Sequence, residues 1–220
     1  NEVAQFCKSL PFNPPKPLYI GGNIEQISYQ IPQITYEKII CFLTKNKIGL
    51  LSLIILVVAE SLCELANERK FLMGVILSGR SNTSYARVIG PMSNLLPIYL
   101  CLDLAKSFKY QLAKIEEQIM TLRKNEMIYL EDIYKETSIN YFRYMSCIFN
   151  LVYSDMKGLD RYKVSQIPVR RKSTDVGMNI DIYIHKQTME VNFVYRKNLF
   201  DFSKDVFEKK LFMHVQEELL

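Results

Sequence analysis

The sequence predicts an α/β fold in which a mixed β-sheet is flanked by helices. Residues 71–77 and 95–102 are almost wholly apolar, which is typical of central strands covered on both faces. Residues 178–195 alternate apolar and polar side chains around a short turn, and this pattern predicts a hairpin. Apolar residues recur at helical spacing from Phe108 to Leu122 and indicate an amphipathic helix. Because strands and helices alternate along the chain, the sequence predicts a layered lobe.

The first part of the chain divides into a connector and the start of this lobe. Residues 1–23 are expected to form an extended connector, because residues 10–17 are rich in proline, which removes backbone donors and restricts the preceding residue. Residues 24–220 are expected to form the lobe, beginning with a short strand that ends at Pro32. Thr35 is the predicted N-cap of the next helix. The apolar face of that helix would contain Tyr36, Ile39, Ile40 and Leu43.

A second helix is predicted over residues 50–66. Its apolar run, residues 48–59, is shorter than the ~20 residues that span a bilayer, and Glu60 and Glu64 follow it directly. We therefore expect a buried core helix and no membrane partner.

The later segments complete the predicted order. Residues 130–135 indicate a short helix, and residues 146–154 indicate a buried strand. Residues 155–175 are polar and predict a loop, in which a solvated surface explains the basic run 170–172 better than a phosphate site does. Ser203 is the predicted N-cap of a terminal helix.

Composition excludes several classes of protein. Hydrophobic residues make up 49% of the chain, which is enough for a core and argues against intrinsic disorder. The net charge of +5 and the pI of about 8.8 are lower than expected for a nucleic-acid binder, which usually concentrates charge on one face. The chain starts at Asn1 without a signal-peptide pattern, which suggests an excised piece of a longer protein.

The five cysteines are widely spaced, lie among apolar residues and form no C-x-x-C pair. They predict neither a zinc site nor a disulfide framework. We expect buried, reduced thiols and a cytoplasmic location. The cysteines are Cys7, Cys41, Cys63, Cys101 and Cys147.

No catalytic or metal-binding residue is predicted in this chain. Of the two histidines, His185 falls on the polar side of a hairpin strand and His214 on the terminal helix. Each is better explained as a surface or packing residue than as a catalyst. Adjacent carboxylates such as Glu116 and Glu117 point to different sides of a helix, so they do not predict a shared acid–base site.

Four fragments, taken in order, resemble motifs of condensation domains from nonribosomal peptide synthetases. Residues 73–80 resemble the strand that ends in a Gly-Arg pair, and residues 89–97 resemble the family's I-G-x-F-x-N-T-L-P motif. Residues 129–133 resemble the P-F-E-D-I end of the family's next motif, and residues 195–201 resemble its Y-N-x-x-L-F-D segment. The shared order and spacing carry the resemblance, which covers nearly the whole chain.

The resemblance implies a two-lobe enzyme with chloramphenicol-acetyltransferase-like lobes, of which this chain would be the C-terminal one. A tunnel between the lobes would admit substrates carried on the phosphopantetheine arms of carrier proteins, with no cofactor bound directly. The missing N-terminal lobe would supply the catalytic H-H-x-x-x-D-G motif and would be the main partner of this chain. The whole enzyme would form amide bonds between carrier-bound thioester substrates, and this chain alone would be inactive. Its uncovered interface could also pair with a second copy.

Three residues are the predicted tunnel and interface residues. By resemblance, Arg80 would pair bidentately with the aspartate of the missing histidine motif, and an exposed loop arginine is the alternative. Ser93 and Asn94 would line the tunnel and hydrogen-bond an acyl or amide group, and a turn entering a strand is the alternative.

The sequence departs from the family pattern at several positions. Met92 and Leu95 replace the motif Phe and Thr, and residues 125–131 are a degenerate form of the H-Q-x-x-P-F-E motif. These departures leave two alternatives open beside peptide-bond formation. One is a non-catalytic binding or scaffold module, and the other is an alcohol O-acyltransferase.

Overall fold

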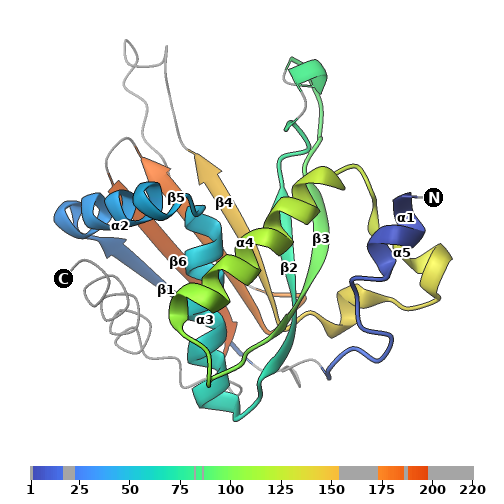
Figure 1. The fold of residues 1–220 in the computed structure, drawn as a ribbon, viewed down its shortest axis with the longest axis horizontal. Coiled ribbons are helices and arrows are strands. Elements are labelled where there is room, and N and C mark those ends of the chain that lie inside the picture. Colours follow the sequence, from blue (N-terminus) through green and yellow to red (C-terminus); the bar gives the residue numbers. More distant parts are fainter. Residues whose placement is uncertain are drawn as a thin grey trace.

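The computed structural model of the chain describes residues 2–16, 23–81, 83–85, 87–153, 173–185 and 188–197. Within these ranges the fold is a six-stranded sheet with five α-helices (Figure 1). The strands are β1 (Ile24–Ile31), β2 (Lys70–Leu77), β3 (Asn94–Cys101), β4 (Cys147–Tyr153), β5 (Met178–His185) and β6 (Thr188–Arg196). The helices are α1 (Glu2–Cys7), α2 (Gln33–Asn46), α3 (Leu50–Ala66), α4 (Phe108–Lys124) and α5 (Leu130–Thr137), with 3₁₀ turns η1 (Thr83–Tyr85) and η2 (Tyr141–Tyr144).

The sheet is mixed, as predicted, and its strands follow the order β1-β6-β5-β4-β2-β3. The three strands β2, β4 and β5 are parallel neighbours. The hairpin β5–β6 is antiparallel, as are the pairs β1–β6 and β2–β3. The predicted α/β architecture is confirmed.

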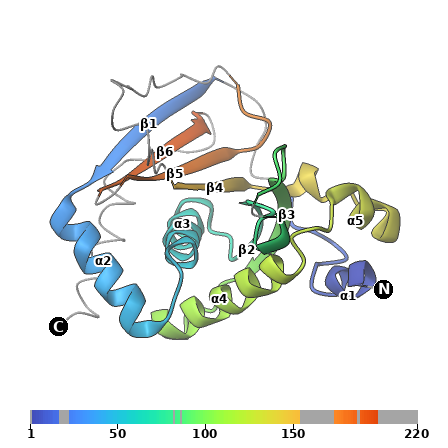
Figure 2. The same cartoon turned by 90° about the horizontal axis from the view of Figure 1, so that it is seen from above.

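Helices α2, α3 and α4 lie on one side of the sheet, whereas α1 and α5 lie together beyond its β3 end (Figure 2). The second predicted helix is confirmed as α3, and its residues are buried from Leu50 to Ala59. A helix that is apolar all round is stable only when it is covered on all sides, and α3 lies between the sheet and its neighbouring helices.

In the described part of the chain, no single helix is long and apolar enough to cross a membrane. The pair α2 and α3 passes that length and composition test together, but the two helices are bent by 108° at their break.

The apolar strand predictions are confirmed in position, but only one of the two strands is central. Strand β2 pairs with β3 on one side and with β4 on the other. Strand β3 is the last strand of the described sheet, so its prediction as a central strand is wrong. The physical reason is Pro97, which has no backbone N–H and is therefore suited to an edge position.

The prediction of an extended connector is wrong for its first residues, which form α1. The side chain of Phe6 is buried, and Leu10 lies in the same core cluster just after the helix. The first proline of the chain is Pro11, so nothing prevents helix formation before it.

Helix α2 begins earlier than predicted, because Pro32 rather than Thr35 is its N-cap. The Pro32 carbonyl accepts the Tyr36 N–H at 2.9 Å, which is the first hydrogen bond of the helix. Thr35 is a buried residue inside the first turn. Ile40 was predicted on the apolar face and is instead 37% exposed.

The remaining element predictions agree with the structure where it describes them. Helix α4 has Ser107 as its N-cap, whose side chain accepts the Tyr110 N–H, and α5, β4 and the β5–β6 hairpin lie where expected. The basic run 170–172, Ser203 and His214 lie outside the described residues.

All five cysteines are free thiols, but they are not all buried. Cys63 and Cys147 are buried as predicted, and Cys7 is half-buried. Cys41 and Cys101 are exposed, so the prediction of burial is wrong for them. Cys41 lies on the outer side of α2, and Cys101 ends the edge strand β3.

Candidate functional site

The segment between β2 and β3, residues 78–93, extends beyond the sheet and contains two of the three predicted site residues (Figure 1). We call this segment the arm. Asn94, the third predicted residue, follows it directly as the first residue of β3. Residues 82 and 86 of the arm lie outside the described residues.

The two sides of the arm approach each other closely at its base, at Gly79. This residue has a φ of +66°, in the left-handed region that favours glycine. A Cβ placed on Gly79 would lie 2.0 Å from the carbonyl oxygen of Met92. Only glycine fits this crossing with the observed backbone.

Arg80 follows this crossing and holds the arm in shape from within. Its Nη1 donates to the carbonyl oxygens of Tyr85 at 2.9 Å and of Val88 at 2.6 Å. Its Nη2 donates to the carbonyl oxygen of Gly90 at 3.0 Å. Guanidinium is a rigid group with five donors, and these three bonds to described residues fix the arm backbone.

The two other predicted residues differ in accessibility. Ser93 is exposed at the end of the arm, whereas Asn94 is buried. The Asn94 side chain donates through Nδ2 to the carbonyl oxygens of Glu126 at 2.9 Å and of Ile128 at 2.6 Å. Both amide hydrogens of Asn94 are therefore used to join β3 to the turn between α4 and α5.

Two residues at the base of the arm, Ser81 and Glu126, were not predicted as site residues from the sequence. The Glu126 carboxylate accepts hydrogen bonds from the Ser81 N–H at 2.9 Å and from the Ser81 hydroxyl at 2.8 Å. Glu126 occupies the Gln position of the degenerate motif at residues 125–131, and that match was the only signal in the sequence that could have drawn attention to it.

The outer part of the arm presents apolar side chains to solvent. Ile89 is 100% exposed and Val88 is 42% exposed.

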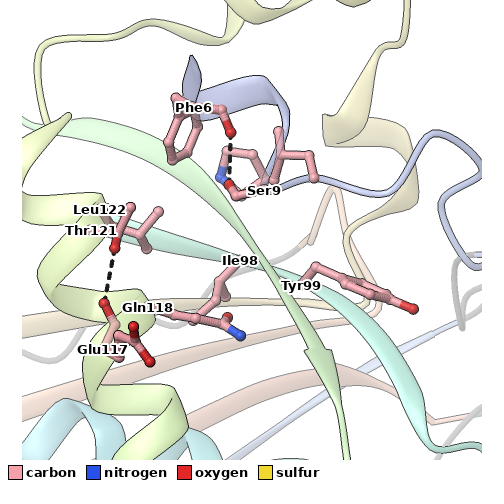
Figure 3. A pocket seen from close by; sticks show the side chains of 10 residues that line it. Phe6, Ser9, Ile98, Tyr99, Glu117, Gln118, Thr121 and Leu122 are labelled. Atoms are coloured by element: carbon pink, nitrogen blue, oxygen red, sulfur yellow. Dashed lines mark hydrogen bonds between the residues drawn. The ribbon is translucent and has the colours of Figure 1, made fainter. Parts of the chain in front are cut away.

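A separate pocket of about 180 Å³ lies between α1, β3 and α4 (Figure 3). Phe6, Ile98 and Leu122 form apolar parts of its wall, and Glu117 and Gln118 of α4 add polar groups. None of the three predicted site residues lines this pocket.

The described residues offer little that could act as a catalyst. His185 is half-buried and stacks on Tyr183, with ring centroids 6.4 Å apart. Among the described residues no group of three His, Cys, Asp or Glu side chains could hold a metal ion. The candidate site is therefore the arm itself. Arg80 braces it, Val88 and Ile89 expose apolar side chains on it, and Ser81 contacts Glu126 at its base.

Comparison with protein families identifies the chain. The condensation-domain family matches residues 4–215, so the chain belongs to this family, which includes the condensation domains of nonribosomal peptide synthetases. A search of curated proteins gave no significant match.

Solved structures with the same fold include several condensation domains. The condensation domain of the monacolin K polyketide synthase aligns with a TM-score of 0.78 at 10% identity, over 99% of this chain and 57% of that one. The first condensation domain of the calcium-dependent antibiotic synthetase aligns with a TM-score of 0.70 at 19% identity, over 98% of this chain and 48% of that one. The epimerization domain from the third module of tyrocidine synthetase B aligns with a TM-score of 0.70 at 11% identity, over 99% of this chain and 58% of that one. The chain spans about half the length of these three proteins.

Proposed function

We propose that this chain is the C-terminal lobe of a condensation-type acyltransferase, which forms amide bonds between thioester substrates carried by carrier proteins. The observation that carries this proposal is the extent of the structural matches. Almost the whole chain aligns with only about half of each condensation or epimerization domain. We infer that a second lobe completes the fold and supplies the catalytic histidine motif.

The arm is the part of this lobe that we expect to face the tunnel and the second lobe. The exposed side chains of Val88 and Ile89 support this assignment, because apolar groups on a braced backbone gain most when another surface covers them. Arg80 is half-buried, and three of its five donors are used within the arm. For its remaining donors we propose a carboxylate partner in the second lobe, the aspartate of the histidine motif.

The test is an assay of amide formation with carrier-loaded donor and acceptor substrates. We expect product from a protein that contains both lobes and none from the 220-residue chain alone. In the two-lobe protein, Arg80→Ala should lower the rate at least about tenfold, because truncating one partner of a charge pair between the lobes costs about 2–5 kcal/mol. Arg87→Ala, which removes an exposed arginine of the same arm, is the matched control and should leave the rate within about twofold.

Three results would count against the proposal. Turnover by the chain alone would show that its own residues are sufficient for catalysis. A two-lobe protein that binds loaded carriers without turnover would favour the scaffold alternative. Turnover with a free alcohol in place of the carrier-bound amine would favour the O-acyltransferase alternative.

A further inference from the structure

Glu126 lies at the turn after α4 and contacts both sides of the arm base. Its side chain accepts two hydrogen bonds from Ser81, which lies on the outgoing side of the arm near its base. Its backbone carbonyl accepts a hydrogen bond from Asn94, where the returning side enters β3. Ser81 and Asn94 are 13 positions apart in the chain, and one residue of the turn between α4 and α5 joins them.

The burial of Glu126 makes these contacts strong. The residue is only 5% exposed, and a carboxylate removed from water is stable only when donors replace its hydration. The two Ser81 donors do so at 2.8 and 2.9 Å, and hydrogen bonds to an ionised acceptor are stronger than neutral ones. Displacing the arm would remove both Ser81 donors from this carboxylate.

The arm itself is braced independently of Glu126. Arg80 joins its outgoing side to three carbonyl groups further along the arm, up to Gly90. Gly79 allows the two sides to cross closely at the base. An arm that is rigid within itself moves as one unit, so its position on the lobe depends on the contacts at its base.

We propose that Glu126 is the positioning residue of the arm. Arg80 determines the shape of the arm, and Glu126 determines where the arm stands relative to the sheet. This inference rests on the proposed function in one respect: the arm position affects catalysis only if the arm faces the tunnel and the second lobe. The effect on the arm itself does not depend on that function.

The first experiment measures hydrogen exchange of the 220-residue chain in four variants. Glu126→Ala removes the acceptor and should speed exchange of the Ser81 amide and of the Val88 amide, which donates to the Tyr85 carbonyl within the arm, at least about tenfold, as expected for losing hydrogen bonds to a charged group. Glu126→Gln keeps a side-chain oxygen that can accept from Ser81, so exchange of these amides should stay within about threefold of the rate in the unchanged chain. Ser81→Ala removes one donor without changing Glu126 and should give an intermediate increase. Glu131→Ala, which removes an exposed carboxylate of the same motif region, is the matched control and should have no effect.

The pattern of exchange decides between positioning and general stabilisation. The amides of β5 and β6 should exchange at unchanged rates in all four variants. If Glu126→Ala speeds exchange equally in the arm and in these strands, or leaves the arm unchanged, the proposal is wrong. If Glu126→Ala does not fold, an unchanged arm in Ser81→Ala would still overturn the proposal.

The second experiment separates this proposal from the proposed function. In the two-lobe protein, Glu126→Ala should lower amide formation and Glu126→Gln should restore most of it. If the two-lobe protein makes no amide while the exchange pattern is as expected, the proposed function fails and the positioning role stands. If amide formation is active but insensitive to Glu126→Ala while the arm exchanges faster, the link between arm position and catalysis is wrong.

Discussion

Two glycines of the arm have positive φ angles, and the space around them differs. Gly79 has a φ of +66°, and its missing Cβ would lie 2.0 Å from a backbone oxygen. Gly90 has a φ of +148°, and a Cβ placed there would have no atom within 4 Å. A residue with a Cβ would be strained at both positions. At position 79 the Cβ would also clash with the backbone of Met92.

At the residue scale, this difference predicts unequal costs for the two alanine substitutions. Gly90→Ala should lower the free energy of unfolding by about 1–2 kcal/mol, the cost of a left-handed backbone with a Cβ. Gly79→Ala adds the clash with Met92 and should cost about 1–3 kcal/mol more, as overpacking does. Urea unfolding of both variants measures the difference. Equal free energies would mean that the arm base relaxes without cost and that the close crossing does not constrain the chain.

At the scale of single elements, α3 has an unusual beginning. Its N-cap is Gly49, which has no side chain to accept the first free N–H groups. Helix α4 contributes an acceptor at this end, because the Glu116 carboxylate accepts the N–H of the N-cap residue Gly49 at 2.8 Å and the Ser52 hydroxyl at 2.7 Å. The negative charge also lies at the positive end of the helix dipole. One side chain therefore caps the core helix and joins it to α4.

We predict that Glu116→Ala lowers the free energy of unfolding by about 1–2 kcal/mol, the usual cost of losing an N-cap with a favourable charge. Glu116→Gln keeps an acceptor but removes the charge, so its cost should be smaller. Glu117→Ala removes the exposed neighbouring carboxylate on α4 and should change stability by less than about 0.5 kcal/mol. Thermal or urea unfolding gives these values. A Glu116→Ala chain as stable as Glu117→Ala would show that water caps α3 equally well.

At the scale of the whole molecule, local sequence patterns predicted which segments form helices and strands. They predicted less well which of these elements lie side by side. The burial of α3 follows from its apolar composition, since a helix that is apolar all round has only one stable environment. The edge position of β3 depends on strand pairing, which no local pattern records. Pro97 was the one local feature that favours an edge strand, whereas the apolar residues around it favoured a central strand.

The candidate site shows the same division between local and distant information. Gly79 and Arg80 form the Gly-Arg pair of one motif, and that motif predicted Arg80 as a site residue. The Ser81–Glu126 contact joins residues 45 positions apart, so the sequence alone gave no reason to pair them. The burial of Asn94 depends on the same turn between α4 and α5. Contacts between distant segments follow from the packing of the elements, which local sequence patterns do not record.

The five thiols report on the packing of the whole molecule, because they range from exposed to fully buried. Burial raises the pKa of Cys147, and burial together with the nearby Glu136 charge raises the pKa of Cys7. A thiol with a raised pKa carries less of the reactive thiolate at a given pH, and burial also blocks the reagent. Both effects protect Cys147, whereas Cys41 and Cys101 are exposed to the reagent.

We therefore predict two classes of thiol when the native chain is alkylated with iodoacetamide at mildly alkaline pH. Cys41 and Cys101 should be modified within minutes, whereas Cys63 and Cys147 should be modified only as fast as the chain unfolds. Raising the pH further should not make Cys147 reactive while the fold persists, because its raised pKa keeps the thiol protonated. Mass spectrometry of the peptides measures each site, and the same reaction in concentrated guanidinium chloride is the control in which all five react. Modification of Cys147 at the rate of Cys101 in the native chain would mean that β4 is not enclosed as described.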